Sequence, residues 1–168
     1  MKKKVIFLTL LLIIIPALVL GATLIITKEP LTEEDAELYY ITGNAFYKQS
    51  DYQEAVKYYE KAANINPLYE EAHNNLAFLY NKLEDYARAA EHLAVLININ
   101  PANPSYHYDY AINLALNIKK TKQGEIEEIE TAIKEFSIAE SLEAGYEHAK
   151  ENIDFLEGMR AEYYSKQG

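Results

Sequence analysis

The sequence predicts an all-α fold, a solenoid of three stacked helical hairpins with a C-terminal capping helix, preceded by one transmembrane helix. Three observations support this prediction. The tetrapeptide Asn-Ile-Asn-Pro occurs at 64–67 and again at 98–101. Columns of small and aromatic residues recur at the same offset as these two copies, which indicates stacked structural units. An uncharged run at 5–26 comes before the first unit.

The uncharged run follows Lys2, Lys3 and Lys4. As a helix rising about 1.5 Å per residue it would span about 33 Å, enough to cross a hydrocarbon core of about 30 Å. It is longer than the apolar part of a cleaved signal peptide, and Leu20 stands where cleavage would favour a small residue. We therefore expect a retained signal anchor at 5–26, with cleavage as the open alternative.

The charges around this run predict its orientation. Positively charged residues favour the cytoplasmic side of a membrane, and here they cluster before the run. We expect a single-pass membrane protein with residues 1–4 in the cytoplasm and the helical domain outside it. Residues 27–35 would form a linker between the anchor and the domain.

The repeated columns are specific enough to suggest a family. The first unit reads Tyr39, Thr42, Gly43, Phe46, Tyr52, Ala55, Tyr59, Ala62 and Pro67, and the second reads His73, Leu76, Ala77, Tyr80, Tyr86, Ala89, Leu93, Leu96 and Pro101. This pattern resembles the tetratricopeptide repeat, abbreviated TPR, over residues 36 to about 160. The small residues of each unit would let its two helices approach closely, with large residues filling the space between them.

The resemblance implies a division of the chain into units. The first unit would cover 36–69, the second 70–103, and the third 104–146 with an insertion of about nine residues; 147–168 would form the capping helix and tail. Helices are expected near 32–48, 52–64, 68–81, 85–98, 104–119, 125–142 and 145–164. Thr32 and Asp35 have the spacing of a capping box before the first helix.

In proteins of this family the first helix of each unit lines a concave groove, which implies a set of partner-binding residues. The stripe beside the core columns contains Tyr40, Asn44, Tyr47 and Lys48 in the first unit, Asn74, Phe78, Asn81 and Lys82 in the second, and Tyr108 and Ile112 in the third. Asparagine amides can pair with the backbone of an extended peptide, and aromatic rings supply contact area. These types are also common on solvated helices, so an ordinary surface is the alternative.

The resemblance also suggests one ligand class that can be checked. Some family members hold the C-terminal carboxylate of heat-shock chaperones with two asparagines and several basic residues. The asparagine places are filled by Asn44 and Asn75, but the basic places hold Tyr40, Ser105 and Asp109. Without cations such a clamp loses its charge-assisted hydrogen bonds, and we do not expect it here.

Charge and motifs exclude several other functions. The formal net charge is −10, and because the four lysines and one glutamate within positions 1–30 give +3, the remainder carries −13. Such an acidic domain is not expected to bind nucleic acid. The chain lacks cysteine and shows no known catalytic or phosphate-binding motif. His73 and His107 share a core column, so we expect them to be packed side chains and not metal ligands.

The sequence therefore favours a protein that is not an enzyme, with no cofactor and no small-molecule substrate. The leading hypothesis is a membrane-anchored scaffold, either an adaptor or a complex-assembly factor, that binds a partner protein or peptide in the groove. The alternative is an extracytoplasmic, chaperone-like holder of unfolded segments. Homo-oligomerisation remains possible.

Overall fold

A computed structural model describes residues 30–121, 126–146 and 148–166. The chain divides into two units, residues 1–31 and residues 32–168. The predicted cytoplasmic N-terminus and the predicted anchor at 5–26 lie outside the described residues. No helix in the described part of the chain is long and apolar enough to cross a membrane.

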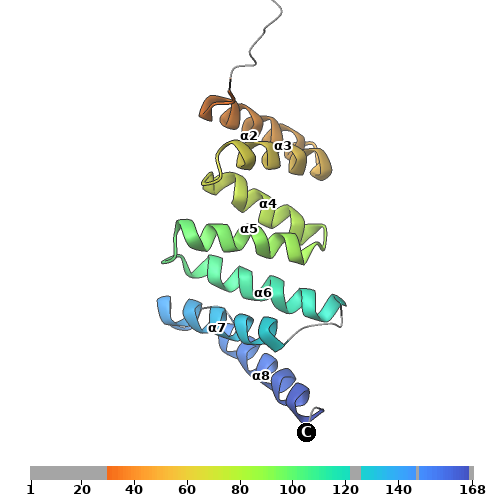
Figure 1. Cartoon of the computed structure of the whole chain (residues 1–168), viewed down its shortest axis with the longest axis vertical. Helices are drawn as coiled ribbons and strands as arrows, with labels where there is room; N and C mark the ends of the chain where they lie inside the picture. Colours follow the sequence, from red (N-terminus) through yellow and green to blue (C-terminus); the bar gives the residue numbers. More distant parts are fainter. Residues whose placement is uncertain (1–29, 122–125, 147, 167–168) are drawn as a thin grey trace, which may run out of the picture. The chain divides into compact units, whose positions relative to one another are not determined.

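The described residues between 32 and 166 form helices that follow one another in chain order along the stack (Figure 1). The described residues contain seven helices and no strands. They are α2 (Glu33–Lys48), α3 (Tyr52–Ile65), α4 (Glu70–Lys82), α5 (Tyr86–Ile99), α6 (Pro104–Thr121), α7 (Ile126–Leu142) and α8 (Ala149–Ser165). Each helix packs against its neighbours in chain order, and the contact between α3 and α4 is the smallest of these. The predicted all-α solenoid is confirmed, while the predicted boundaries between units stay a prediction.

Side-chain caps set where several helices begin. The backbone N–H of Asp35 donates to Thr32 Oγ1 at 3.4 Å, and the Thr32 N–H donates to Asp35 Oδ2 at 2.8 Å. This reciprocal pair is the predicted capping box, which satisfies two N–H groups that the helix itself leaves unpaired. Asp51 caps α3 and Asp85 caps α5 in the same column of the repeat.

Two predicted helix starts are wrong by two and four residues. Before α4, the Leu68 N–H donates to Asn66 Oδ1 at 3.1 Å, which keeps this segment in a turn until Glu70. Before α8, the Glu140 carboxylate accepts the backbone N–H groups of Gly145 and Tyr146. Both turns use side-chain hydrogen bonds that compete with helix formation and leave no hydrophobic periodicity to detect.

The third hairpin is longer than the second. Helix α6 contains 18 residues, whereas α4 contains 13. Helix α7 contains 17 residues, whereas α5 contains 14. The predicted insertion therefore lengthens both helices, and 122–125, between them, lie outside the described residues.

A close approach between α2 and α3 depends on Gly43. A Cβ atom at this position would lie 2.6 Å from ring carbons of Tyr59, well inside van der Waals contact. Tyr59 is only 1% exposed, so its ring has no room to move away. The equivalent positions, Ala77 and Ala111, are buried alanines. The absence of a side chain at Gly43 thus makes space for the large ring of Tyr59.

The predicted packing of His73 is confirmed. His73 is 6% exposed, and its Nε2 lies 3.1 Å from the carbonyl oxygen of Pro67, to which it donates. His73 Nδ1 then accepts from His92 Nδ1 at 3.0 Å. The ring of Tyr80 stacks on His92 at 5.6 Å between centroids. Burial lowers the pKa of His73, and burial together with the nearby His73 lowers the pKa of His92 to about 4.

The third hairpin repeats this arrangement with a different partner. His107 is 4% exposed and its Nε2 lies 2.9 Å from the carbonyl oxygen of Pro101. Its Nδ1 lies 2.7 Å from the carboxylate of Glu135, which is also buried. His107 and Glu135 are 28 positions apart in the sequence, whereas His73 and His92 are 19 apart. The difference equals the nine inserted positions, so the two pairs occupy equivalent places. One column of the repeat therefore joins the two helices of a hairpin through a histidine hydrogen bond.

Replacing Gly43 with alanine is expected to destabilise the domain by about 1–3 kcal/mol, because the added methyl group would overlap a buried ring. Thermal unfolding followed by circular dichroism measures this loss. Gly158→Ala in α8 is the control: no atom lies within 4 Å of its added Cβ, so it should stabilise the domain by up to about 1 kcal/mol. A neutral Gly43→Ala variant would contradict the packing described here.

The His73–His92 pair is expected to make the domain less stable as the pH falls. Because the folded-state pKa of His92 lies below its ordinary value, the folded state disfavours the proton that the unfolded chain accepts below about pH 6.5. Between pH 7 and pH 5, His92→Gln should therefore lose about 1 kcal/mol less stability than the wild type, allowing for partial solvent screening.

Urea unfolding at both pH values tests this effect. His148→Gln is the matched control, because His148 is exposed. Its stability at pH 7 should match that of the wild type, which checks that replacing a histidine with glutamine is not itself harmful. An unchanged pH dependence in His92→Gln would show that this pair does not couple protonation to folding.

Candidate functional site

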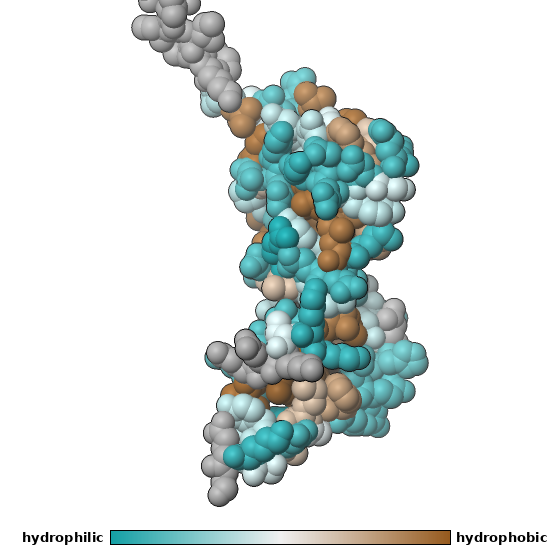
Figure 2. All heavy atoms as spheres, turned by 90° about the vertical axis from the view of Figure 1, so that its right-hand side faces the viewer, coloured by the Kyte–Doolittle hydropathy of each residue, from teal (hydrophilic) through white to brown (hydrophobic). Residues whose placement is uncertain are grey.

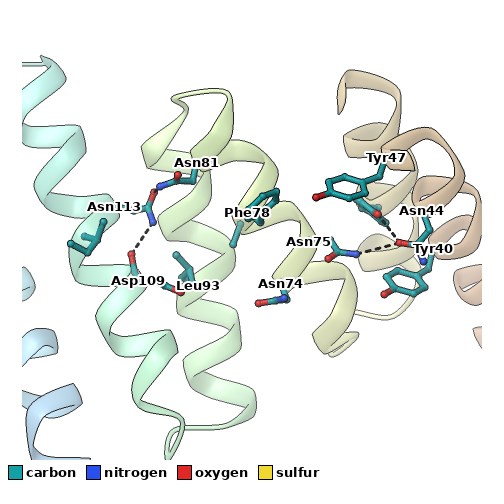
Figure 3. A pocket seen from close by; sticks show the side chains of 13 residues that line it. Tyr40, Asn44, Tyr47, Asn74, Asn75, Phe78, Asn81, Leu93, Asp109 and Asn113 are labelled. Atoms are coloured by element: carbon teal, nitrogen blue, oxygen red, sulfur yellow. Dashed lines mark hydrogen bonds between the residues drawn. The ribbon is translucent and has the colours of Figure 1, made fainter. Parts of the chain in front are cut away.

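The first helices of the three hairpins line a shared hollow of about 660 Å³. Figure 3 shows its labelled side chains, which come mainly from α2, α4 and α6. The lining consists of amide and aromatic side chains with a few aliphatic ones: Tyr40, Asn44, Tyr47, Tyr59, Asn74, Asn75, Ala77, Phe78, Asn81, Leu93, Asp109, Ile112 and Asn113. We call this hollow the groove.

At the α2 side, a buried tyrosine orients an asparagine. The hydroxyl of Tyr59 donates to Asn44 Oδ1 at 2.7 Å, and Asn75 Nδ2 donates to the same oxygen at 3.5 Å (Figure 3). Burial raises the pKa of Tyr59 to about 12, so this hydroxyl keeps its proton and acts as a donor. In the described part of the chain Asn44 Nδ2 has no partner, which leaves its N–H donors for a ligand.

At the α6 side, a second pair of amides links two helices. Asn81 Nδ2 donates to Asn113 Oδ1 at 2.8 Å, and Asn113 Nδ2 donates to the backbone carbonyl of Asp109 at 2.8 Å. Asn113 is only 3% exposed, so burial and two hydrogen bonds fix its orientation. The pair holds Asn81 at the edge of the groove.

Two exposed aromatic rings, one from α2 and one from α4, contact each other. The rings of Tyr47 and Phe78 meet edge to face, with centroids 6.2 Å apart. Tyr47 is 39% exposed and Phe78 is 52% exposed, although both are large and partly apolar. Asn74 is exposed beside them, and its amide has no partner among the described residues. The groove thus offers apolar contact area and unsatisfied amide groups together.

The charges around the groove are negative. A neighbouring hollow of about 290 Å³ is lined by Glu70 and Glu71 together with Tyr40, Asn74, Asn75 and Tyr106. Glu70 accepts a hydrogen bond from Tyr106 at 2.5 Å, and Glu71 is exposed. None of the described residues that line either hollow is a lysine or an arginine.

The places where a carboxylate clamp would need cations have other roles. The ring of Tyr40 packs against Tyr69, with centroids 5.1 Å apart. Ser105 Oγ lies 2.7 Å from the hydroxyl of Tyr146, and Asp109 lines the groove. The structure therefore brings Asn44 and Asn75 together, as in the predicted asparagine pair, without a positive charge beside them.

Seven of the predicted partner-binding residues line the groove: Tyr40, Asn44, Tyr47, Asn74, Phe78, Asn81 and Ile112. Three predicted residues do not. Lys48 is exposed outside the lining, and Lys82 Nζ lies 5.0 Å from the centroid of the Tyr52 ring, where it makes a cation–π contact.

The predicted groove position of Tyr108 is wrong. Tyr108 is 9% exposed and belongs to the core cluster of the third hairpin. Its ring packs edge to face against Phe136 and Tyr146, each with centroids 5.3 Å away. Asn152 of α8 donates to its hydroxyl at 3.3 Å. A ring this large reaches the following helices, whereas Asn74, one repeat earlier, stays exposed.

The sequence interpretation did not include several lining residues among the partner-binding ones, namely Tyr59, Asn75, Ala77, Leu93, Asp109 and Asn113. Asn113 lies one repeat after Leu79, which is fully buried. An asparagine at a position that is otherwise part of the core was the signal that could have identified Asn113. Tyr59 was assigned to the core, where its ring does lie, and only its hydroxyl reaches the groove.

Comparisons with known proteins agree with this geometry. Residues 46–111 match the model of the tetratricopeptide repeat family. The chain is 30% identical over 131 residues to Hsp70-Hsp90 organizing protein 3 of Arabidopsis thaliana, a match that covers 77% of this chain but 20% of that protein. The chain therefore spans about a fifth of the length of this curated relative.

Solved structures share the fold. The first TPR of Spaghetti (RPAP3), bound to the HSP90 peptide SRMEEVD, has a TM-score of 0.60 at 20% identity and covers 79% of this chain and 98% of that one. The Arabidopsis OM64 TPR domain has a TM-score of 0.57 at 20% identity, covering 76% and 98%. MamA from Desulfovibrio magneticus RS-1 has a TM-score of 0.59 at 21% identity, covering 79% and 73%. Residues 46–111 thus carry tetratricopeptide repeats, and the described helices share the fold of these solved TPR domains.

Removing the Tyr59 hydroxyl is expected to release Asn44. Tyr59→Phe should lower the free energy of unfolding by about 1 kcal/mol, because a buried hydrogen bond is lost while the ring is kept. Urea unfolding measures the change. Tyr58→Phe is the control, since the Tyr58 hydroxyl has no partner in the described residues. Equal stabilities of the two variants would contradict the role assigned to the Tyr59 hydroxyl.

Proposed function

We propose that the protein is a membrane-anchored scaffold that binds a segment of a partner protein in the groove. The observation that supports this most directly is the groove itself. It brings together side chains from three successive first helices, and its unpaired amide donors and exposed rings are available to a ligand. The TPR fold is a protein-interaction scaffold in its relatives, which agrees with this use of the surface.

An extended segment suits the groove better than a folded surface or a small molecule. Asn44 offers N–H donors, and Asn74 offers both a donor and an acceptor, the set needed to pair with a peptide backbone. Tyr47 and Phe78 provide rigid rings for the side chains of such a segment. A groove open to solvent along three helices also leaves room for a chain to enter and leave.

The charges favour a neutral or basic segment. Asp109 lines the groove, Glu70 and Glu71 line the neighbouring hollow, and no lysine or arginine lines either one in the described residues. The peptide in the RPAP3 complex, SRMEEVD, is acidic. Like charges at a binding surface weaken association and slow encounter, so a peptide of that kind is a poor match for this groove.

The anchor would place the scaffold at a membrane. We propose that residues 5–26 span the bilayer, with residues 1–4 in the cytoplasm and the TPR domain on the other side. A tethered domain would raise the local concentration of its partner at the membrane. A selective adaptor is the favoured form of this function, and a chaperone-like holder of many unfolded segments is the alternative.

Affinity capture tests the proposal. The full-length tagged chain would be solubilised from its native membranes and compared with an Asn44→Ala, Phe78→Ala variant by mass spectrometry. We expect the groove variant to lose a few partners at least tenfold, because it removes both an amide and a ring. A Leu83→Ala, Leu142→Ala variant is the control; both leucines are exposed but lie outside the groove lining.

The outcomes separate the possibilities. Loss confined to the groove variant supports a selective adaptor, and excess SRMEEVD peptide should not displace the captured partner. Equal capture by both variants would show that the partner binds to a surface other than the groove. Capture of many unrelated proteins through the groove would favour the holder.

A further inference from the structure

Helix α2 carries an exposed stripe next to the face that lines the groove. Its members alternate by four and three positions: Glu34, Leu38, Ile41, Ala45 and Lys48. All five are exposed, and the two large apolar side chains, Leu38 and Ile41, are 61% and 54% exposed. This alternation places the five side chains on one face of the helix. Hydrophobic side chains are visible at the α2 end of the stack in Figure 2.

One repeat later, two positions of this face are buried. Leu38 corresponds to Ala72 and Ala45 corresponds to Leu79, each one full repeat further on in α4. Both α4 residues are 0% exposed. They belong to one buried cluster with Ala55 of α3. The stripe on α2 is therefore a stacking face of the solenoid, and among the described residues no preceding helix covers it.

The stripe is complementary to itself when two copies run in opposite directions. Its acidic end, Glu34, and its basic end, Lys48, are equally far from Ile41 at the centre. An antiparallel pair with its two-fold axis at Ile41 would place Glu34 of one copy beside Lys48 of the other. It would also set each Leu38 against the small Ala45, so that large and small side chains alternate across the contact.

The charges at the two ends point to this partner. Neither Glu34 nor Lys48 makes an ion pair within one copy among the described residues. The neighbouring Glu37 is directed elsewhere, because its carboxylate accepts the hydroxyl of Tyr69. An antiparallel pairing also repeats the stack's own geometry, in which α4 follows α3 after a short turn and packs against it.

We propose that the protein forms a symmetric dimer through the exposed stripe of α2, with a second copy of this chain as the partner. Burial of Leu38 and Ile41 from both copies drives the association. The two reciprocal contacts between Glu34 and Lys48 fix the antiparallel register. None of the five stripe residues lines the groove, so a dimer would present two grooves and could engage two partner segments at once.

The absence of cysteine from the chain makes a position-specific test possible. Single substitutions in the full-length chain, reconstituted in membranes, would be exposed to a mild oxidant. Ile41→Cys should form a covalent dimer, because the two residues meet on the axis. Glu34→Cys and Lys48→Cys should each crosslink poorly alone but form a heterodimer when mixed. Glu91→Cys, an exposed position on α5, is the control.

Charge reversal then tests the register. In the Ile41→Cys background, Lys48→Glu should reduce the yield of covalent dimer at least tenfold, and adding Glu34→Lys should restore it. Circular dichroism checks that each variant remains helical. The proposal is overturned if Ile41→Cys crosslinks no better than Glu91→Cys, or if the double reversal fails to restore the dimer. Either result would assign the stripe to a different occupant.

Discussion

The contact between Tyr59 and Gly43 links the core of the domain to the groove. The ring can lie against α2 only because Gly43 has no side chain, and this position brings the Tyr59 hydroxyl within 2.7 Å of Asn44 Oδ1. The hydrogen bond turns the donors of Asn44 toward the groove. A packing constraint inside the first hairpin therefore determines how an amide is presented at the surface. A substitution in this part of the core would change the orientation of the Asn44 side chain in the groove.

Equivalent positions of the three units carry different side chains, and these side chains make different contacts. At the Tyr59 position the second hairpin has Leu93, which contributes only apolar lining to the groove. At the His73 position the first hairpin has Tyr39, which packs against Tyr58, whereas the third has His107 bound to Glu135. Each pair spans the same two helices. Equivalent positions thus join the two helices of each hairpin, while their polarity varies from one unit to the next.

Much of the fold was predictable because the repeat period, the offset from Pro67 to Pro101, places each small residue opposite another small one and each ring in the space between. Most of the groove was predictable for a related reason, since the residues beside the core stripe follow the same period. Tyr108 was not predictable in this way, because its burial depends on Tyr146 and α8, which follow the non-repeating insertion. The start of α8 was missed because the carboxylate of Glu140 caps a turn further along the chain, a contact with no periodic signature.

The central claim is that the first helices of three hairpins act as one binding surface for a segment of another protein. Hydrogen exchange of the full-length chain, measured with and without a captured partner segment, tests it most directly. A partner segment bound in the groove should slow exchange in α2, α4 and α6, while the second helices of the hairpins, α3, α5 and α7, should change little. Protection confined to those second helices, or to the ends of α6 and α7 around the insertion, would contradict it.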